Sequence, residues 1–200
     1  MQNVLIYLQE NELRFVRELC DYLRFPSVST QSHHRADVEA AARWLVEHCQ
    51  SIGLHARLCP TEGNPVVIAQ TPRNQSGSSP RRHHFVIYGH YDVQPAEPFD
   101  LWKSPPFEPR LDGRSLFARG ACDNKGQHFA HLKAVEAYLK TNTDLPCDLT
   151  FVIEGEEADV FRGVCATTTG LPSVGHSRAS RPMDWECSTS QRAAASTSER

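Results

Sequence analysis

Three short groups of residues carry side chains that could bind a metal ion or move a proton. His90 and Asp92 directly follow the apolar run Phe85–Tyr88. Residues i and i+2 at the end of a strand point to one face, so we expect the imidazole and the carboxylate side by side. A carboxylate in that position fixes the tautomer of a metal-ligating histidine. The pair therefore fits a zinc site, although His-x-Asp also occurs by chance in sequences without one.

Two further acidic positions stand out. Asp123 lies between Gly120 and Gly126, just before a predicted helix, where glycines allow a tight turn that can aim a carboxylate into a cleft. The same position would suit an aspartate that caps the helix. The acidic run Glu154–Glu157 closes a second apolar run, and carboxylates buried there need cations nearby. A solvated strand end is the alternative.

Other catalytic chemistries find little support. The sequence contains no G-x-S-x-G motif, and Lys125 precedes Gly126, the reverse of the order in a phosphate-binding loop. The seven cysteines are scattered, with no C-x-x-C pair. This argues against a disulfide scaffold or a thiolate zinc finger. We expect free thiols in a reducing compartment, and hence a cytoplasmic location.

Composition limits the class of partner. The 200 residues are 40% hydrophobic and 22% charged, which are the values of a globular domain. No apolar run approaches the roughly 18 residues of a membrane helix, and the N-terminus lacks the pattern of a signal peptide. The net charge of -3 offers no attraction for nucleic acid or an acidic membrane. We expect neither as a partner.

Alternating helices and strands must position these groups. Apolar spacing predicts helices over residues 3–25, with Leu5 and Leu13 inward, over residues 36–52, and over residues 125–140. Short apolar runs predict strands over residues 55–58, 66–70, 85–88 and 149–153. This order predicts an α/β fold with a mostly parallel sheet flanked by helices. Functional residues of such sheets gather at the carboxyl ends of strands, where His90 and the acidic run fall.

Taken together, the motifs resemble one family. They are, in order, Gly89-His90-Tyr91-Asp92-Val93-Gln94-Pro95, Asp112-Gly113, Arg119-Gly120-Ala121-Cys122-Asp123-Asn124-Lys125-Gly126 and Glu154-Gly155-Glu156-Glu157. This set resembles the zinc metallopeptidases that include glutamate carboxypeptidases, acetylornithine deacetylases, aminoacylases and carnosine-type dipeptidases. The segment Asp92-Val93-Gln94-Pro95 is most similar to the dipeptidase branch of this family. The resemblance runs from about residue 10 to Glu157 and covers the N-terminal part of that family.

The resemblance implies a role for each residue. His90 would ligate a metal ion, Asp92 would orient His90, and Asp123 would bridge two zinc ions through a cis peptide to Asn124. Manganese or cobalt would also accept these ligands. Glu157 would act as general base, taking a proton from a metal-bound water and passing it to the leaving amine. The implied substrate is a dipeptide or an N-acyl amino acid.

The sequence departs from the family after this point. Aligned on Glu154-Gly155, the pattern makes Glu157 the base and leaves Ala158 where a second metal ligand belongs. A shift of one residue would instead make Glu156 the base and Glu157 the ligand. We expect residues 1–157 to form part of a catalytic domain and residues 158–200 to be a disordered or non-native tail. The family's dimerisation domain would be absent. The alternative to a peptidase is therefore an inactive fragment that binds metal weakly or serves in an interaction.

Overall fold

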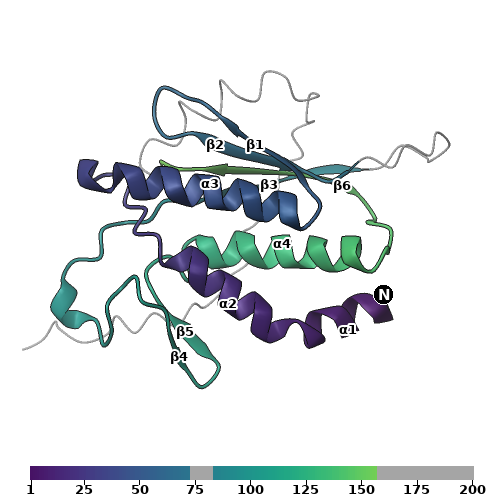
Figure 1. Cartoon of the computed structure of the whole chain (residues 1–200), viewed down its shortest axis with the longest axis horizontal. Coiled ribbons are helices and arrows are strands. Elements are labelled where there is room, and N and C mark those ends of the chain that lie inside the picture. Colours follow the sequence, from purple (N-terminus) through teal and green to yellow (C-terminus); the bar gives the residue numbers. More distant parts are fainter. Residues whose placement is uncertain (73–82, 157–200) are drawn as a thin grey trace, which may run out of the picture. The chain divides into compact units, whose positions relative to one another are not determined.

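Four strands form one sheet in the order β1-β2-β6-β3, and helices pack against it (Figure 1). The computed structural model describes residues 1–72 and 83–156. Its elements are α1 (Gln2–Glu10), α2 (Glu12–Leu23), η1 (Ser32–His34), α3 (Arg35–Ser51), β1 (His55–Cys59), β2 (Val66–Gln70), β3 (His84–His90), η2 (Phe99–Leu101), β4 (Arg110–Asp112), β5 (Ser115–Phe117), α4 (Lys125–Lys140) and β6 (Asp148–Glu154). All of them lie within one unit, Met1–Gly170.

The α/β class is confirmed, but the described sheet is mixed rather than mostly parallel. β3 runs parallel to β6, whereas β2 runs antiparallel to both β1 and β6. The connection between β1 and β2 is too short for a parallel crossover, so these strands must form an antiparallel hairpin. The apolar run of β2 reflects burial on both faces, which is not confined to parallel strands.

The main hydrophobic core lies between one face of this sheet and helices α3 and α4 (Figure 1). Alternate residues of β2 and β6 point into it, as the two-residue period of a strand requires. The core combines Val67 and Ala69 of β2, Phe151 and Ile153 of β6, Val38, Ala41, Leu45 and Cys49 of α3, and Phe129, Leu132 and Val135 of α4. The remaining strand residues Cys59, Val66, Ile68 and Val152 form a smaller cluster. Both faces of β2 and β6 are thus buried.

The N-terminal segment corrects one expectation. It forms two helices rather than one, because α1 ends at Glu10 and Asn11 interrupts the helix, with its side-chain amide donating to the Tyr7 carbonyl. Leu5 of α1 and Leu13 of α2, which lie on either side of this break, are exposed rather than inward as expected. Both helices nevertheless contact α4.

Helices α3 and α4 lie where their apolar spacing predicted them. α4 matches the expected residues 125–140, and α3 differs by one residue at each end. Gly53 follows α3 with a φ of 104°, a left-handed conformation that glycine adopts without strain. Within the two described ranges, no helix has the length and apolar character needed to cross a bilayer. The segment from residue 158 onward lies outside the described residues, so the expected tail stays a prediction.

Candidate metal centre

Two parallel strands end together at the candidate site. In the register of β3 and β6, His90 is the partner of Glu154, the last residue of β6. The Tyr91 N–H then donates to the Glu154 carbonyl over 2.7 Å, which extends the pairing by one residue. The carboxyl ends of both strands therefore meet at one edge of the sheet, as expected for functional residues of an α/β fold.

His90 lies between two carboxylates. Its Nδ1 is 3.1 Å from the Asp92 carbonyl oxygen and 3.3 Å from Asp92 Oδ1. Its Nε2 is 3.2 Å from Asp123 Oδ1. His90 and Asp92 are buried, whereas 69% of the Asp123 side chain is exposed. With Nδ1–H directed at Asp92, the Nε2 lone pair faces the side of the imidazole where Asp123 lies.

Asp92 is itself held from another part of the chain. Ser29 Oγ donates to Asp92 Oδ2 over 2.6 Å. Ser27, two residues earlier, binds the backbone on both sides of Asp92. Its Oγ donates to the Tyr91 carbonyl, and its own carbonyl accepts from the Val93 N–H. The turn after α2 therefore fixes both the backbone and the carboxylate behind His90.

Asp123 reaches the site from the loop before α4. The peptide bond between Asp123 and Asn124 is cis, as the family resemblance implied. The capping alternative is not what the structure shows, because the N-cap position of α4 is Asn124 and no side chain caps the helix. Asn124 Oδ1 instead accepts from the backbone N–H of His90 over 3.0 Å. This bond joins the Asp123 loop to the end of β3.

Glu154 and Glu156, at the end of β6, have different surroundings. Glu154 is buried and accepts a hydrogen bond from the Tyr88 hydroxyl. Burial raises the pKa of Glu154, and the Tyr88 bond offsets part of that effect. Glu156 turns to the loop after β1, where it accepts from the Asn64 N–H over 3.1 Å. Glu157 lies outside the described residues, so its place relative to His90 stays a prediction.

The spacing of the two described ligand atoms fits a divalent metal ion. Two ligand atoms on a tetrahedral zinc lie about 3.3 Å apart when each bond is about 2.0–2.1 Å. His90 Nε2 and Asp123 Oδ1 are 3.2 Å apart. The carboxylate behind Nδ1 is the usual support for a ligating histidine. Imidazole and carboxylate suit zinc, manganese and cobalt alike.

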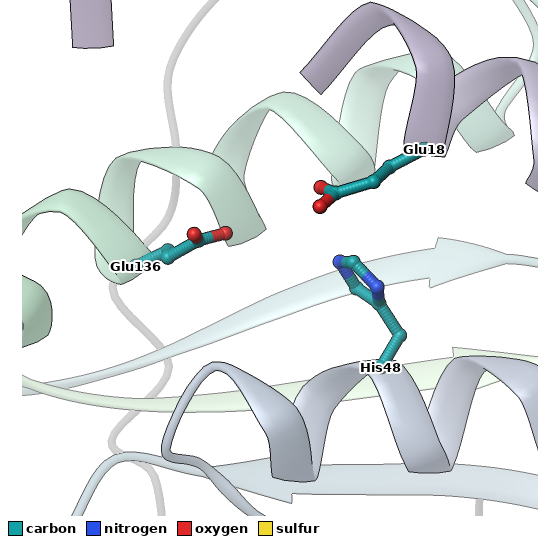
Figure 2. A group of neighbouring side chains, drawn as sticks. All are labelled: Glu18, His48 and Glu136. Carbon is teal, nitrogen blue, oxygen red and sulfur yellow. The ribbon is translucent and has the colours of Figure 1, made fainter. Parts of the chain in front are cut away.

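A second group of potential ligands lies between three helices. Glu18 of α2, His48 of α3 and Glu136 of α4 each direct a ligand atom to one place, all within 4.8 Å of one another (Figure 2). However, the Lys133 ammonium donates to Glu18 over 2.5 Å and to His48 and Glu136 over 2.8 Å. A lysine therefore supplies the cation here, and we interpret the cluster as an ion-pair network.

This Lys133 network perturbs its members in a consistent direction. Burial and the nearby Lys133 charge lower the pKa of His48 to about 4, so His48 is neutral and can accept from the ammonium. Burial raises the pKa of Glu18, but hydrogen bonds from Lys133 and Arg14 outweigh it and hold that pKa below the usual value. The pKa of Glu136 is lowered in the same way. The carboxylates are therefore charged beside the buried ammonium.

One cavity among the described residues lies away from this site. It has a volume of about 400 Å³ and is lined by residues that include Gln70, His84 and Asp148. These residues stand at the opposite ends of the strands from His90. We assign this cavity no role.

The sequence motifs pointed to the three residues that meet at the site, but not to Ser29, which binds Asp92, nor to the Lys133 ion-pair network. The structure brings His90, Asp92 and Asp123 together, as expected from their motifs. Ser29 carried no signal, because it is 63 residues from Asp92 and serine is common in loops. Lys133 could have been suspected, since its place in the periodic pattern of α4 is an inward one.

Comparison with known proteins agrees with these motifs. Residues 86–177, which include His90, Asp123 and Glu157, match the model of peptidase family M20/M25/M40. The Cys-Gly metallodipeptidase DUG1 of Candida albicans is 32% identical over 160 residues, covering 75% of this chain and 33% of that protein. The human Beta-Ala-His dipeptidase is 32% identical over 169 residues, covering 78% and 32%. The chain thus spans about a third of the length of these relatives.

Solved structures show the same likeness. The crystal structure of human carnosine dipeptidase 1 superposes with a TM-score of 0.72 at 27% identity, covering 84% of this chain and 37% of that one. An M20 family metallo-carboxypeptidase from Sulfolobus solfataricus gives a TM-score of 0.67 at 32% identity, covering 77% and 33%. The motifs, the fold and these matches show that the chain belongs to peptidase family M20/M25/M40.

Proposed function

We propose that this chain carries part of the active site of a metal-dependent peptidase that cleaves the amide bond of a dipeptide or an N-acyl amino acid. The observation that carries the proposal is the pair of donors, His90 Nε2 and Asp123 Oδ1, 3.2 Å apart where β3 and β6 end. The dipeptidase relatives support the class of substrate. Zinc is the proposed metal, and manganese or cobalt would suit the same donors.

Each described residue then has a defined task. A divalent metal held by His90 and Asp123 would polarise the amide carbonyl and make water a better nucleophile at neutral pH. Asp92 keeps the His90 proton on Nδ1, so that Nε2 presents its lone pair to the metal. Ser29 holds Asp92 in the orientation that this requires.

We assign general base catalysis to Glu157, which would take the proton of the attacking water and deliver it to the leaving amine. The contacts of Glu156 favour this register over the one shifted by a residue. Its carboxylate accepts from the Asn64 N–H, and its oxygens lie beside Gly63. A carboxylate held in that loop is not available as the base.

A specific observation favours a second candidate function. Ala158 stands where the family resemblance implies a further metal ligand, and alanine offers no donor. In this second candidate the chain binds a single metal ion weakly and does not turn over substrate. It would then act as a metal-binding or interaction protein rather than as an enzyme.

Metal content and turnover of the purified 200-residue chain distinguish the two candidates. Two tightly bound zinc ions and measurable dipeptide hydrolysis would establish the peptidase. One weak ion without hydrolysis would establish the second candidate, and Ala158→Glu should then strengthen binding. His90→Ala is the control and should abolish zinc binding in either case. If His90→Ala binds zinc as wild type does, the site is misplaced.

We also propose a cytoplasmic location. Cys20, Cys49 and Cys59 are buried free thiols, which fits a reducing compartment. Separating cell fractions and locating the chain by immunoblotting tests this. Its recovery in a secreted or membrane fraction would contradict the proposal.

A further inference from the structure

A buried histidine that the proposed function does not use lies beside the candidate site. His128 is the fourth residue of α4 and is 1% exposed. Its Nδ1 is 3.0 Å from Asn124 Oδ1, and its Nε2 is 3.2 Å from the Tyr22 hydroxyl oxygen. Both ring nitrogens therefore have a polar partner in the core.

The partners determine the tautomer of His128. An amide oxygen can only accept, so Nδ1 must carry the proton that is donated to Asn124. Nε2 is then left with a lone pair, which accepts from the Tyr22 O–H. Tyr22 is fully buried, and burial raises its pKa well above the usual value, so this hydroxyl keeps its proton. In this arrangement both ring nitrogens of the buried His128 and the hydroxyl of the buried Tyr22 have a hydrogen-bond partner.

Asn124 connects His128 to the end of β3. Its Oδ1 also accepts from the His90 N–H over 3.0 Å, and its Nδ2 donates to Gln127 Oε1 over 2.6 Å. Three hydrogen bonds thus fix the orientation of one amide group. The network packs directly on the strand, because a Cβ atom at Gly89 would lie 2.7 Å from Asn124 Oδ1 and 3.0 Å from His128 Nδ1.

We propose that His128 is a positioning residue of the candidate metal centre. As the Nδ1–H tautomer it holds the Asn124 amide against the end of β3, and this fixes the separation between His90 and Asp123. The consequence for metal binding rests on the proposed function, whereas the hold on the His90 backbone does not. His128 contacts neither donor and acts only through Asn124.

Hydrogen exchange of the His90 amide in the metal-free chain tests this directly. In His128→Leu the Asn124 amide loses one of its donors, and the His90 amide should exchange roughly tenfold faster than in a control. Val135→Ala is that control, because it weakens the core from the same helix without touching Asn124. His128→Asn places an N–H donor where Nδ1–H lies, and should restore slow exchange.

Nitrogen NMR of histidine-labelled wild type supplies a readout that needs no variant. His128 should be the Nδ1–H tautomer, and an Nε2–H tautomer would overturn the proposal. Equal exchange of the His90 amide in His128→Leu and Val135→Ala would overturn it as well.

Zinc affinity separates this inference from the proposed function. It should fall about tenfold in His128→Leu relative to Val135→Ala. If wild type binds no zinc but the His90 amide responds as expected, the proposed function fails and the positioning role stands. If wild type binds zinc while the two variants exchange and bind alike, the positioning role fails alone.

Discussion

The Lys133 network predicts that the folded chain loses stability in mild acid through His48. The pKa of His48 is lowered to about 4, first by burial and then by the Lys133 and Arg14 charges, against the opposing attraction of Glu18 and Glu136. In the unfolded chain an ordinary histidine has a pKa of about 6.5. As the pH falls, the unfolded chain therefore takes up this proton before the folded chain does.

The magnitude follows from these two pKa values. The contribution of His48 to stability is intact above about pH 6.5 and is lost as the pH falls from there towards about 4. Between about pH 7.5 and 4.5, the loss amounts to about 2.5 kcal/mol of unfolding free energy. That is a sizeable share of the roughly 5–15 kcal/mol that stabilises an ordinary domain.

Urea unfolding followed by circular dichroism at several pH values measures this loss. His48→Gln keeps an acceptor for Lys133 but cannot titrate, so its stability should fall less steeply than that of wild type over the same range. The exposed His33 offers a matched control, and His33→Gln should follow the wild-type curve. Parallel curves for wild type and His48→Gln would refute the assignment of a neutral, buried His48.

Three further outcomes are expected. Lys133→Met leaves Arg14 as the remaining cation beside the buried Glu136 and the half-buried Glu18, and should lower the unfolding free energy by about 1–3 kcal/mol. Lys140→Met at the exposed end of α4 should change it by less than about 0.5 kcal/mol, and thermal melts of both variants measure the difference. Ser29→Ala removes the 2.6 Å hydrogen bond behind His90, so calorimetric titration should show zinc affinity about tenfold lower; unchanged affinity would count against that support. Gly155→Ala would place a Cβ atom 2.3 Å from the Tyr91 hydroxyl oxygen, and its urea midpoint should fall by an amount equivalent to about 1–3 kcal/mol.

Local patterns predicted the elements well where one signal dominated. The apolar spacing of residues 125–140 and the run at residues 66–70 gave α4 and β2 with their observed bounds. The break at Asn11 was not foreseen, because no proline or glycine marks it and the apolar spacing continues across it. The direction of β2 was also missed, since burial on both faces produces the same apolar run in parallel and antiparallel strands.

For the candidate site, too, residues within short sequence motifs could be predicted, whereas residues that act through distant contacts could not. His90 and Asp92 are two residues apart, and glycines mark the loop of Asp123, so the sequence itself carried those signals. Ser29 acts through Asp92, which only the folded chain brings near, and His128 acts through Asn124, whose bond to the distant His90 backbone exists only in the fold. Single residues of common type have no pattern from which such contacts could be inferred. Glu157 stays a prediction, because the described chain ends one residue before it.

The shared ammonium of Lys133 has a consequence for how the helices open. Acceptors from α2, α3 and α4 share this one nitrogen, so detaching α2 or α3 takes a hydrogen-bond acceptor away from the buried Lys133 ammonium. Partial fraying of a single helix is therefore penalised. The three helices should protect their amides with one common free energy and unfold as one cooperative unit.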